Sequence, residues 1–283
     1  MVRRRVTLCI AAITIVAVAE LWLWAQAVSP TDPLHRPFDD LLDLYVRDGL
    51  VYYQALRADR GKLDRYIASL DTPDVVTAYQ RWDQNQRAAF WLNAYTAFVL
   101  RTIIDHYPIR GRASGYPPSS IRQIPGAFES LPRRAAGRSV TLDAIEKTIL
   151  PEFHDPRLYL ALGRGAIGSP RLRSEAFSGN RLEGQLKNVT TECATRSECI
   201  LIDSAANRIS VTPVVGWHEA EFIAAYATSA SGFTNRSPIE RAVLAFILPN
   251  LLATERYFLD KNEFLVAYSE FDWSLNDLTG RTR

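Results

Sequence analysis

The segment Asp155–Gly179 holds the residue types best suited to chemistry in this chain. A short apolar run opens there into a glycine-rich loop that carries Ser169 and several cations. Three of these cations are arginines: Arg164, Arg171 and Arg173. Loops held by a rigid scaffold are where binding and catalytic residues concentrate. This segment is therefore the first candidate for a functional site.

The glycines of the loop allow two interpretations. Gly163, Gly165 and Gly168 fit the spacing G-x-G-x-x-G, which binds dinucleotides when a helix follows directly. Here Ser169-Pro170 follows instead, and the flanking segments do not alternate as strand, helix and strand. We therefore expect a turn that glycine makes possible, and no nucleotide or other cofactor.

The arginines suit an anionic ligand, because the planar guanidinium group binds carboxylate or phosphate through paired hydrogen bonds. Arg164, Arg171 and Arg173 are therefore ligand-binding candidates. The alternative is that they are solvated or form ion pairs with Glu175 and Glu183.

Ser169 is a candidate catalytic nucleophile if a base lies beside it. Lys147 or Glu146 would serve, because a desolvated lysine can activate a serine. Turn formation before Pro170 explains the same serine without catalysis. Glu146 is equally well explained by an ion pair with an arginine.

Asn93 lies in an apolar segment that predicts a buried helix over 85–106. A buried amide needs hydrogen-bond partners. Asn93 is therefore expected to fix a neighbouring loop, with the lining of a pocket as the alternative.

Cys193 and Cys199 lie close together in a polar stretch, and in an oxidising compartment such a pair can close a disulfide loop. Free thiols and half of a zinc site are the alternatives. None of the four histidines has metal-ligand spacing with another, so no metal site is expected. His218, beside Trp217, is interpreted as a packing residue.

The N-terminus resembles a targeting segment. Three arginines precede an apolar run, and the small residues Ala25 and Ala27 fit a signal-peptidase site. The run also approaches the length that crosses a bilayer. Residues 1–27 are therefore either a cleaved signal peptide or an uncleaved membrane anchor, and the basic start places the remainder outside the cytoplasm.

The exported part is electrically balanced. Without residues 1–27 the chain carries 30 basic and 30 acidic residues. No global positive charge is left to bind nucleic acid. The membrane is an expected partner, through the N-terminal segment if it is uncleaved, and an anionic ligand is a candidate. The sequence identifies no protein partner.

Apolar spacing and turn signals predict one mostly helical α+β domain over 38–283, with a small antiparallel sheet, after a linker at 28–37. Besides 85–106, helices are predicted at 38–46, 62–70, 74–82, 180–187, 217–226, 238–246 and, capped by Thr141, up to Leu150. A hairpin is predicted at 200–202 and 209–211, a strand at 264–273, and a surface loop at 111–132.

Four segments in the same order resemble the family known as domain of unknown function 547. They are Phe90–Tyr95, Thr141–Glu146, Asp155–Leu162 and Phe271–Asn276. The resemblance runs from about Phe38 to Asn276 and implies a related fold, but the family has no settled activity to carry over.

This chain departs from the family pattern at three positions. Arg164 and Ser169 stand where relatives often have cysteines, and Lys147 stands where they have a histidine. A thiol beside an imidazole is a nucleophilic pair, so any thiol chemistry of the family is lost here. If those cysteines are structural in relatives, the change matters little.

We therefore expect an exported or membrane-anchored binding or scaffolding module. The alternative is a hydrolase or transferase of envelope material that uses Glu146, Lys147 and Ser169. A compact cluster of these side chains with Asn93 would favour the enzyme, whereas a salt bridge of Arg164 that fills the loop would argue against it.

Overall fold

The computed structural model describes residues 32–229, 233–261 and 263–279. The chain divides into two units, Met1–Thr31 and Asp32–Arg283. The predicted signal or anchor segment lies outside the described residues. Among the residues that are described, no helix is long and apolar enough to cross a membrane. The second unit is a mixed α+β fold, mostly helical with small sheets.

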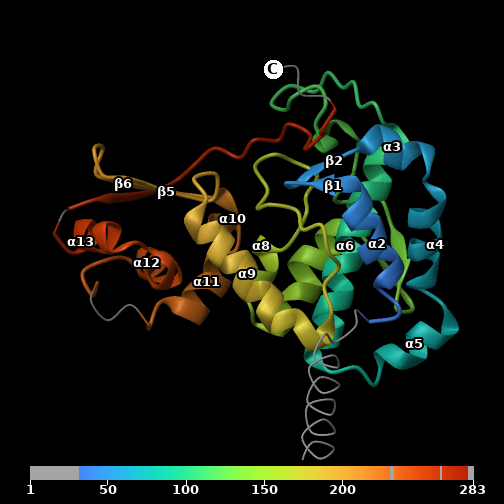
Figure 1. Cartoon of the computed structure of the whole chain (residues 1–283), viewed down its shortest axis with the longest axis horizontal. Coiled ribbons are helices and arrows are strands. Elements are labelled where there is room, and N and C mark those ends of the chain that lie inside the picture. Colours follow the sequence, from blue (N-terminus) through green and yellow to red (C-terminus); the bar gives the residue numbers. More distant parts are fainter. Residues whose placement is uncertain (1–31, 230–232, 262, 280–283) are drawn as a thin grey trace, which may run out of the picture. The chain divides into compact units, whose positions relative to one another are not determined.

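Helix α6 (Gln84–His106) is the centre of this unit and is buried on nearly all sides. Asp83 caps its start, because its carboxylate accepts from Gln86 N (2.8 Å) while the Gln86 side chain accepts from Asp83 N (3.0 Å). Among the helices that pack against it are α3 (Tyr53–Ala58), α4 (Gly61–Ser69) and α9 (Leu182–Thr195) (Figure 1). The predicted buried helix is confirmed.

The remaining helices surround this core. They are α2 (Arg36–Tyr45), α5 (Pro73–Tyr79), α7 (Leu142–Ala144), α8 (Arg157–Leu160), α10 (Pro213–Trp217), α11 (Glu219–Tyr226), α12 (Pro238–Ile247) and α13 (Ala253–Lys261). Most lie where apolar spacing predicts a helix. The exceptions are α8, α10 and α13, which the sequence did not indicate, as it did not indicate α3 in the core.

Three small sheets complete the fold. Two are antiparallel hairpins, β1 (Val46–Arg47) with β2 (Leu50–Val51) and β3 (Arg133–Ala135) with β4 (Arg138–Val140). The third joins β5 (Ile200–Asp203), β6 (Arg208–Val211) and β7 (Leu265–Tyr268). The β5–β6 hairpin is confirmed, but β7 runs parallel to β6, so this sheet is mixed rather than antiparallel.

Several predicted boundaries are corrected. The hydroxyl of Thr141 accepts from Ala144 N (3.0 Å) as an N-cap should, but the helix then widens into a π-helical turn, Ile145–Ile149. The helix expected from Trp217 is interrupted at His218, whose φ and ψ are −123° and 36°. The segment 111–132 is not wholly a surface loop, because Ile121, Ile124 and Phe128 are buried.

Two further corrections concern segment ends. Asn180 lies inside the 3₁₀ turn Gly179–Arg181 rather than capping α9, which continues to Thr195. The strand expected over 264–273 stops at Tyr268 because the following residues run against the glycine-rich loop, with Ala166 bridged to Leu275.

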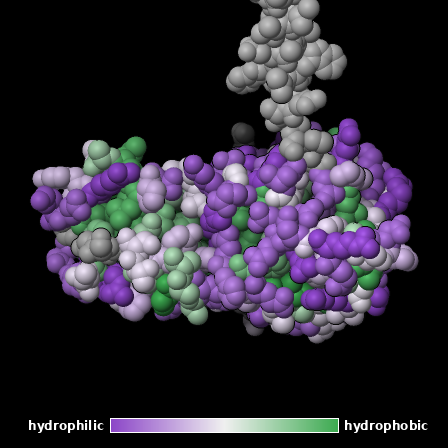
Figure 2. Space-filling view, turned by 90° about the horizontal axis from the view of Figure 1, so that it is seen from below, coloured by the Kyte–Doolittle hydropathy of each residue, from purple (hydrophilic) through white to green (hydrophobic). Residues whose placement is uncertain are grey.

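Exposed large apolar side chains gather in the last third of the described chain. Figure 2 shows a broad hydrophobic patch at the end of the unit that carries α12 and α13, where hydrophilic residues are sparser than elsewhere on that face. The exposed side chains of this region include Leu201, Leu252, Tyr257, Leu265 and Tyr268.

The folded unit begins inside the segment predicted as a linker. His35 is buried, and its Nδ1 lies 2.8 Å from the Tyr66 hydroxyl. Pro37 lies in the first turn of α2 instead of ending a linker. Burial lowers the pKa of His35 to about 4, against the opposing charge of Asp32. The imidazole is therefore neutral in the native state at neutral pH.

This burial predicts a pH-dependent loss of stability. The unfolded chain binds a proton at His35 near pH 6.5 and the native chain only near pH 4, so acidification across this window favours unfolding by roughly 3 kcal/mol. His35→Asn keeps a hydrogen-bond acceptor near Tyr66. The free energy of unfolding of this variant should lack the part of the pH dependence that His35 contributes. Urea unfolding at a series of pH values measures it, and identical pH profiles for the two proteins would contradict it.

Candidate functional site

A buried ionic cluster forms around Glu146, which lies in the π-helical turn. Its Oε1 accepts from Arg164 Nη2 (2.5 Å) and lies 3.0 Å from His218 Nε2, and its Oε2 accepts from the Tyr95 hydroxyl (2.9 Å). Since a carboxylate only accepts, His218 donates from Nε2. All four side chains are buried. The cluster thus joins α6, the π turn, the glycine-rich loop and the α10–α11 junction.

Glu146 is held as an anion. Burial alone would raise the pKa of this carboxyl, but the charge of Arg164 and the hydrogen bonds from His218 and Arg164 hold it well below its usual range. Glu146 is therefore an anion in the native state at neutral pH and accepts hydrogen bonds from three side chains.

Arg164 fills the interior of the loop. Its side chain is 2% exposed, and Nη1 donates to the Tyr159 carbonyl oxygen (3.1 Å). Tyr159 in turn stacks on His218, with ring centroids 3.5 Å apart and planes within 4°. The salt bridge that would argue against an enzyme is thus present. Glu146 also has the arginine partner expected of it.

A cleft of about 340 Å³ opens over this cluster. Glu146, Arg164 and His218 line it. Its other lining residues are the aromatic Phe128, Trp217 and Trp273 and the charged Arg122, Asp143, Lys147 and Glu221. A concave site with aromatic walls and a few fixed polar groups is typical of small-molecule binding.

The aromatic walls come from separate parts of the chain. Trp217 lies 4.8 Å from Phe271 and 6.0 Å from Trp273, measured between ring centroids, and Trp273 also contacts Phe128 and Tyr116. These contacts fix Trp217 although 46% of it is exposed. The Arg164 guanidinium carbon also lies over the Trp217 ring, 5.7 Å from its centroid. The cleft therefore presents a held and partly exposed indole.

The proposed catalytic residues are not brought together. Lys147 is exposed and pairs with Asp143 (2.5 Å), while Ser169 Oγ accepts from Arg164 N (3.3 Å). Glu146 and Lys147 line the cleft, but Ser169 lines a second cavity of about 230 Å³. In the described part of the chain no hydrogen bond joins Ser169 to either residue.

The other loop arginines are occupied by carboxylates. Arg171 pairs with Asp48 (2.9 Å) and Glu192 (2.7 Å), and Arg173 pairs with Glu175 (2.9 Å) and Glu192 (3.0 Å). An anionic ligand would have to displace these partners. Arg171 lines the second cavity. Binding of an anionic ligand by Arg171 in this cavity stays a prediction.

Asn93 and the cysteines occupy framework positions. The Asn93 amide donates to the Phe177 carbonyl oxygen (2.8 Å) and accepts from Phe177 N (2.9 Å), so it fixes a loop and lines neither cavity. Cys193 and Cys199 form a disulfide with a Cα–Cα distance of 5.1 Å, at the end of α9. No group of three metal-ligating side chains is found among the described residues.

The glycine-rich loop is held by the C-terminal segment. Ile167 N donates to the Ser274 carbonyl oxygen and Gly168 N to that of Asp272, both at 2.8 Å. A Cβ on Gly168 would lie 2.6 Å from Asp272 N. Glycine is therefore required for this close approach and helps to place Trp273.

Gly168→Val should consequently lower the free energy of unfolding by about 1–3 kcal/mol, the usual cost of overpacking. Gly184→Ala is the matched control, because a Cβ on this exposed glycine of α9 meets nothing within 4 Å, and alanine should stabilise the helix slightly. Urea unfolding compares the two. Equal stability of the Gly168→Val protein and the wild type would refute the close approach.

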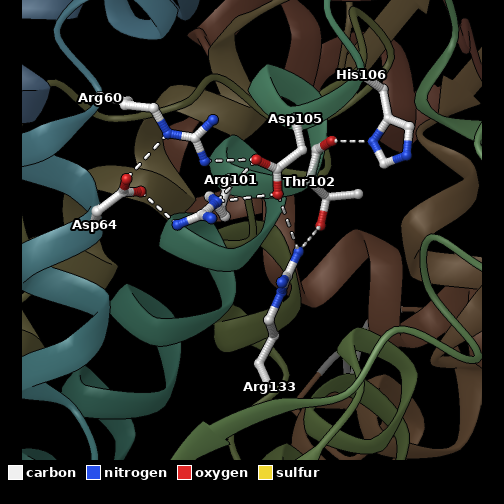
Figure 3. Close-up of polar contacts among 7 residues, drawn as sticks. All are labelled: Arg60, Asp64, Arg101, Thr102, Asp105, His106 and Arg133. Carbon is white, nitrogen blue, oxygen red and sulfur yellow. Dashed lines mark hydrogen bonds and ion pairs between the residues drawn. The ribbon is translucent and has the colours of Figure 1, made fainter.

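A second polar cluster joins β3 with α4 and α6 (Figure 3). In it three arginines alternate with two aspartates: Arg60, Arg101, Arg133, Asp64 and Asp105. Asp105 is the centre, 2.6 Å from Arg60, 3.0 Å from Arg101 and 3.8 Å from Arg133. These partly exposed pairs line neither cavity, and each such pair contributes little to stability. We interpret the cluster as structural.

Sequence reasoning missed the residues that complete the site. His218 and the adjacent Trp217 were interpreted as packing, and Tyr95, Tyr159 and Trp273 were given no role in a site. His218 is 72 positions from Glu146, and no motif links them. The available signal was local: a Trp-His pair followed by Glu219, at the boundary of two short helices.

A family model described as "Protein of unknown function, DUF547" matches residues 79–192. The match includes α6, Glu146, the glycine-rich loop and most of α9, and it is shorter than the range inferred from motifs. No curated protein and no solved structure matches the chain. Over residues 79–192 the chain therefore resembles this family of unknown function.

Proposed function

We propose that this chain is an exported ligand-binding module whose binding site is the cleft over Glu146 and Arg164. The observation that carries the proposal is the pairing of Arg164 with Glu146 inside a water-accessible aromatic cleft. The pair gives the cleft a rigid polar floor. The charge of Arg164 and its hydrogen bond also lower the pKa of Glu146 and keep it ionised.

Among the residues that the structure describes, the candidate nucleophile Ser169 has no hydrogen bond to Lys147 or Glu146, which supports binding over hydrolysis. Ser169 and Lys147 line different cavities, and Arg164 and Ser169 stand where the resemblance places cysteines. A nucleophile needs a base within hydrogen-bond reach. The alternative is a hydrolase or transferase of envelope material. It would require the loop to move until Ser169 and Lys147 lie within hydrogen-bond reach of each other.

Export is part of the proposal and rests on the sequence of residues 1–27. In a bacterial host, fractionation of cells expressing the full-length chain should find it in the periplasm or the membrane. The mass of the mature N-terminus then decides between cleavage and anchoring. Recovery in the cytoplasmic fraction alone would overturn export.

Co-sedimentation with isolated envelope material tests binding against catalysis. The purified full-length chain should sediment with the material without releasing soluble fragments from it. Trp217→Ala should weaken retention, whereas Ser169→Ala should leave it unchanged. Fragment release that disappears in Ser169→Ala would establish the enzyme instead, and absence of retention would overturn the binding module.

A further inference from the structure

We propose that the cleft binds a neutral saccharide, with one face of a sugar ring against Trp217. This inference rests on the proposed function and names the chemical class of its ligand. Three properties of the cleft support it: the partly exposed indole, the balance of its charges, and the protein cations that already lie over its aromatic rings.

The indole of Trp217 is suited to a sugar ring. The face of an aromatic ring carries partial negative charge and attracts the polarised C–H bonds of a pyranose. Trp217 is 46% exposed yet supported by Phe271 and Trp273 of the C-terminal segment. A supported side chain loses little conformational entropy when a ligand stacks on it.

The charges that line the cleft cancel. Three are cations, Arg122, Lys147 and Arg164, and three are anions, Asp143, Glu146 and Glu221. A ligand with a net charge of either sign therefore gains no overall attraction. Sugar hydroxyls both donate and accept, so they can satisfy carboxylates and guanidinium groups together.

A quaternary ammonium ligand, the other common occupant of aromatic sites, is disfavoured. The Arg122 guanidinium carbon already lies 4.2 Å from the Phe128 ring centroid and 4.7 Å from that of Trp273. The Arg164 guanidinium carbon likewise lies 5.7 Å from the Trp217 ring centroid, so each aromatic ring that lines the cleft already has a cation of the protein beside it. A second cation would meet the charge of Arg122.

A purely apolar ligand is also disfavoured. It would cover Asp143, Lys147 and Glu221 without replacing their hydrogen bonds to water, and burial of unpaired charges is costly. A polyhydroxyl ligand avoids this penalty while still covering Trp217.

Binding of matched hexasaccharides to the full-length chain tests this inference. The protein is kept in a detergent without a sugar headgroup, and tryptophan fluorescence and calorimetry report binding. The probes are the neutral hexamers of glucose, xylose and N-acetylglucosamine. The hexamer of glucosamine, which is cationic, and that of galacturonic acid, which is anionic, are the charged controls.

At least one neutral hexamer should bind, and more tightly than either charged hexamer. Trp217→Ala should weaken this binding by at least about tenfold, and Trp217→Phe by less, as expected for a central aromatic anchor. Tyr257→Ala is the matched control, because Tyr257 is 66% exposed on α13 and does not line the cleft. It should leave binding unchanged.

Three results would each overturn the proposal of a neutral saccharide ligand. They are tighter binding of a charged hexamer, no binding of any neutral hexamer, and binding that Trp217→Ala leaves unchanged. If envelope retention still depended on Trp217 in those cases, the binding module would stand with a different ligand. If retention also failed, both proposals would fall. Unchanged circular dichroism of the Trp217 variants confirms that they are folded.

Discussion

Glu146→Leu should lower the free energy of unfolding by about 3–5 kcal/mol, the usual cost of leaving one buried charge without its partner. Arg164 is 2% exposed, and Glu146 is its ionised partner at 2.5 Å. Without this carboxylate the guanidinium keeps the Tyr159 carbonyl oxygen as its other hydrogen-bond acceptor (3.1 Å). Urea unfolding followed by circular dichroism gives the value.

The double variant Glu146→Leu/Arg164→Met separates charge from packing. Replacing both members of a buried pair with apolar residues is often neutral or stabilising. The double variant should therefore be more stable than Glu146→Leu alone, although it carries one more substitution. The loss of unfolding free energy in the double variant could instead equal the sum of the losses in Glu146→Leu and Arg164→Met alone. The two side chains would then act independently, and the basis for a fixed polar floor in the cleft would be removed.

Local features of the fold were predictable from sequence. The apolar run over 85–106 indicated a helix buried on all sides, and α6 is one. Ser237 and Pro238 marked the start of α12, where the Ser237 hydroxyl accepts from Glu240 N. Turn residues between two apolar runs indicated the β5–β6 hairpin. Each of these signals acts over a few residues and depends little on distant contacts.

The site itself depends on long-range contacts, which local patterns do not carry. Glu146 was expected to pair with an arginine, but the same carboxylate also holds His218 from the far side of the fold. This contact accompanies a helix break at His218 that apolar periodicity does not reveal. Trp273 reaches the cleft only because its segment pairs with the glycine-rich loop, 105 positions earlier at Gly168.

Asn93 illustrates a candidate whose structural role outweighs its functional one. Segment 176–178, which connects the glycine-rich loop to α9, is held between two buried amides. Asn93 makes both of its bonds to Phe177 (2.8 and 2.9 Å), and Gln185 bonds Ser178 N and the Ala176 carbonyl oxygen (both 2.9 Å). The two side chains satisfy the backbone there much as neighbouring strands would.

Asn93→Leu should therefore lower the free energy of unfolding by about 2–4 kcal/mol, because it leaves the Phe177 N–H and carbonyl buried without partners. Gln185→Leu should act similarly through Ala176 and Ser178. Asn188→Leu, on the exposed face of α9, is the matched control and should change stability by no more than about 0.5 kcal/mol.

The two amides hold one short segment, so their effects should not be independent. Once either is lost the segment can move to water, and the second substitution then removes less. The Asn93→Leu/Gln185→Leu protein should be more stable than the sum of the single losses implies. Amide hydrogen exchange at Phe177 and Ser178 provides the local measurement. Fast exchange in each single variant indicates release of the whole segment, whereas exchange confined to one residue would show that each amide holds only its own partner.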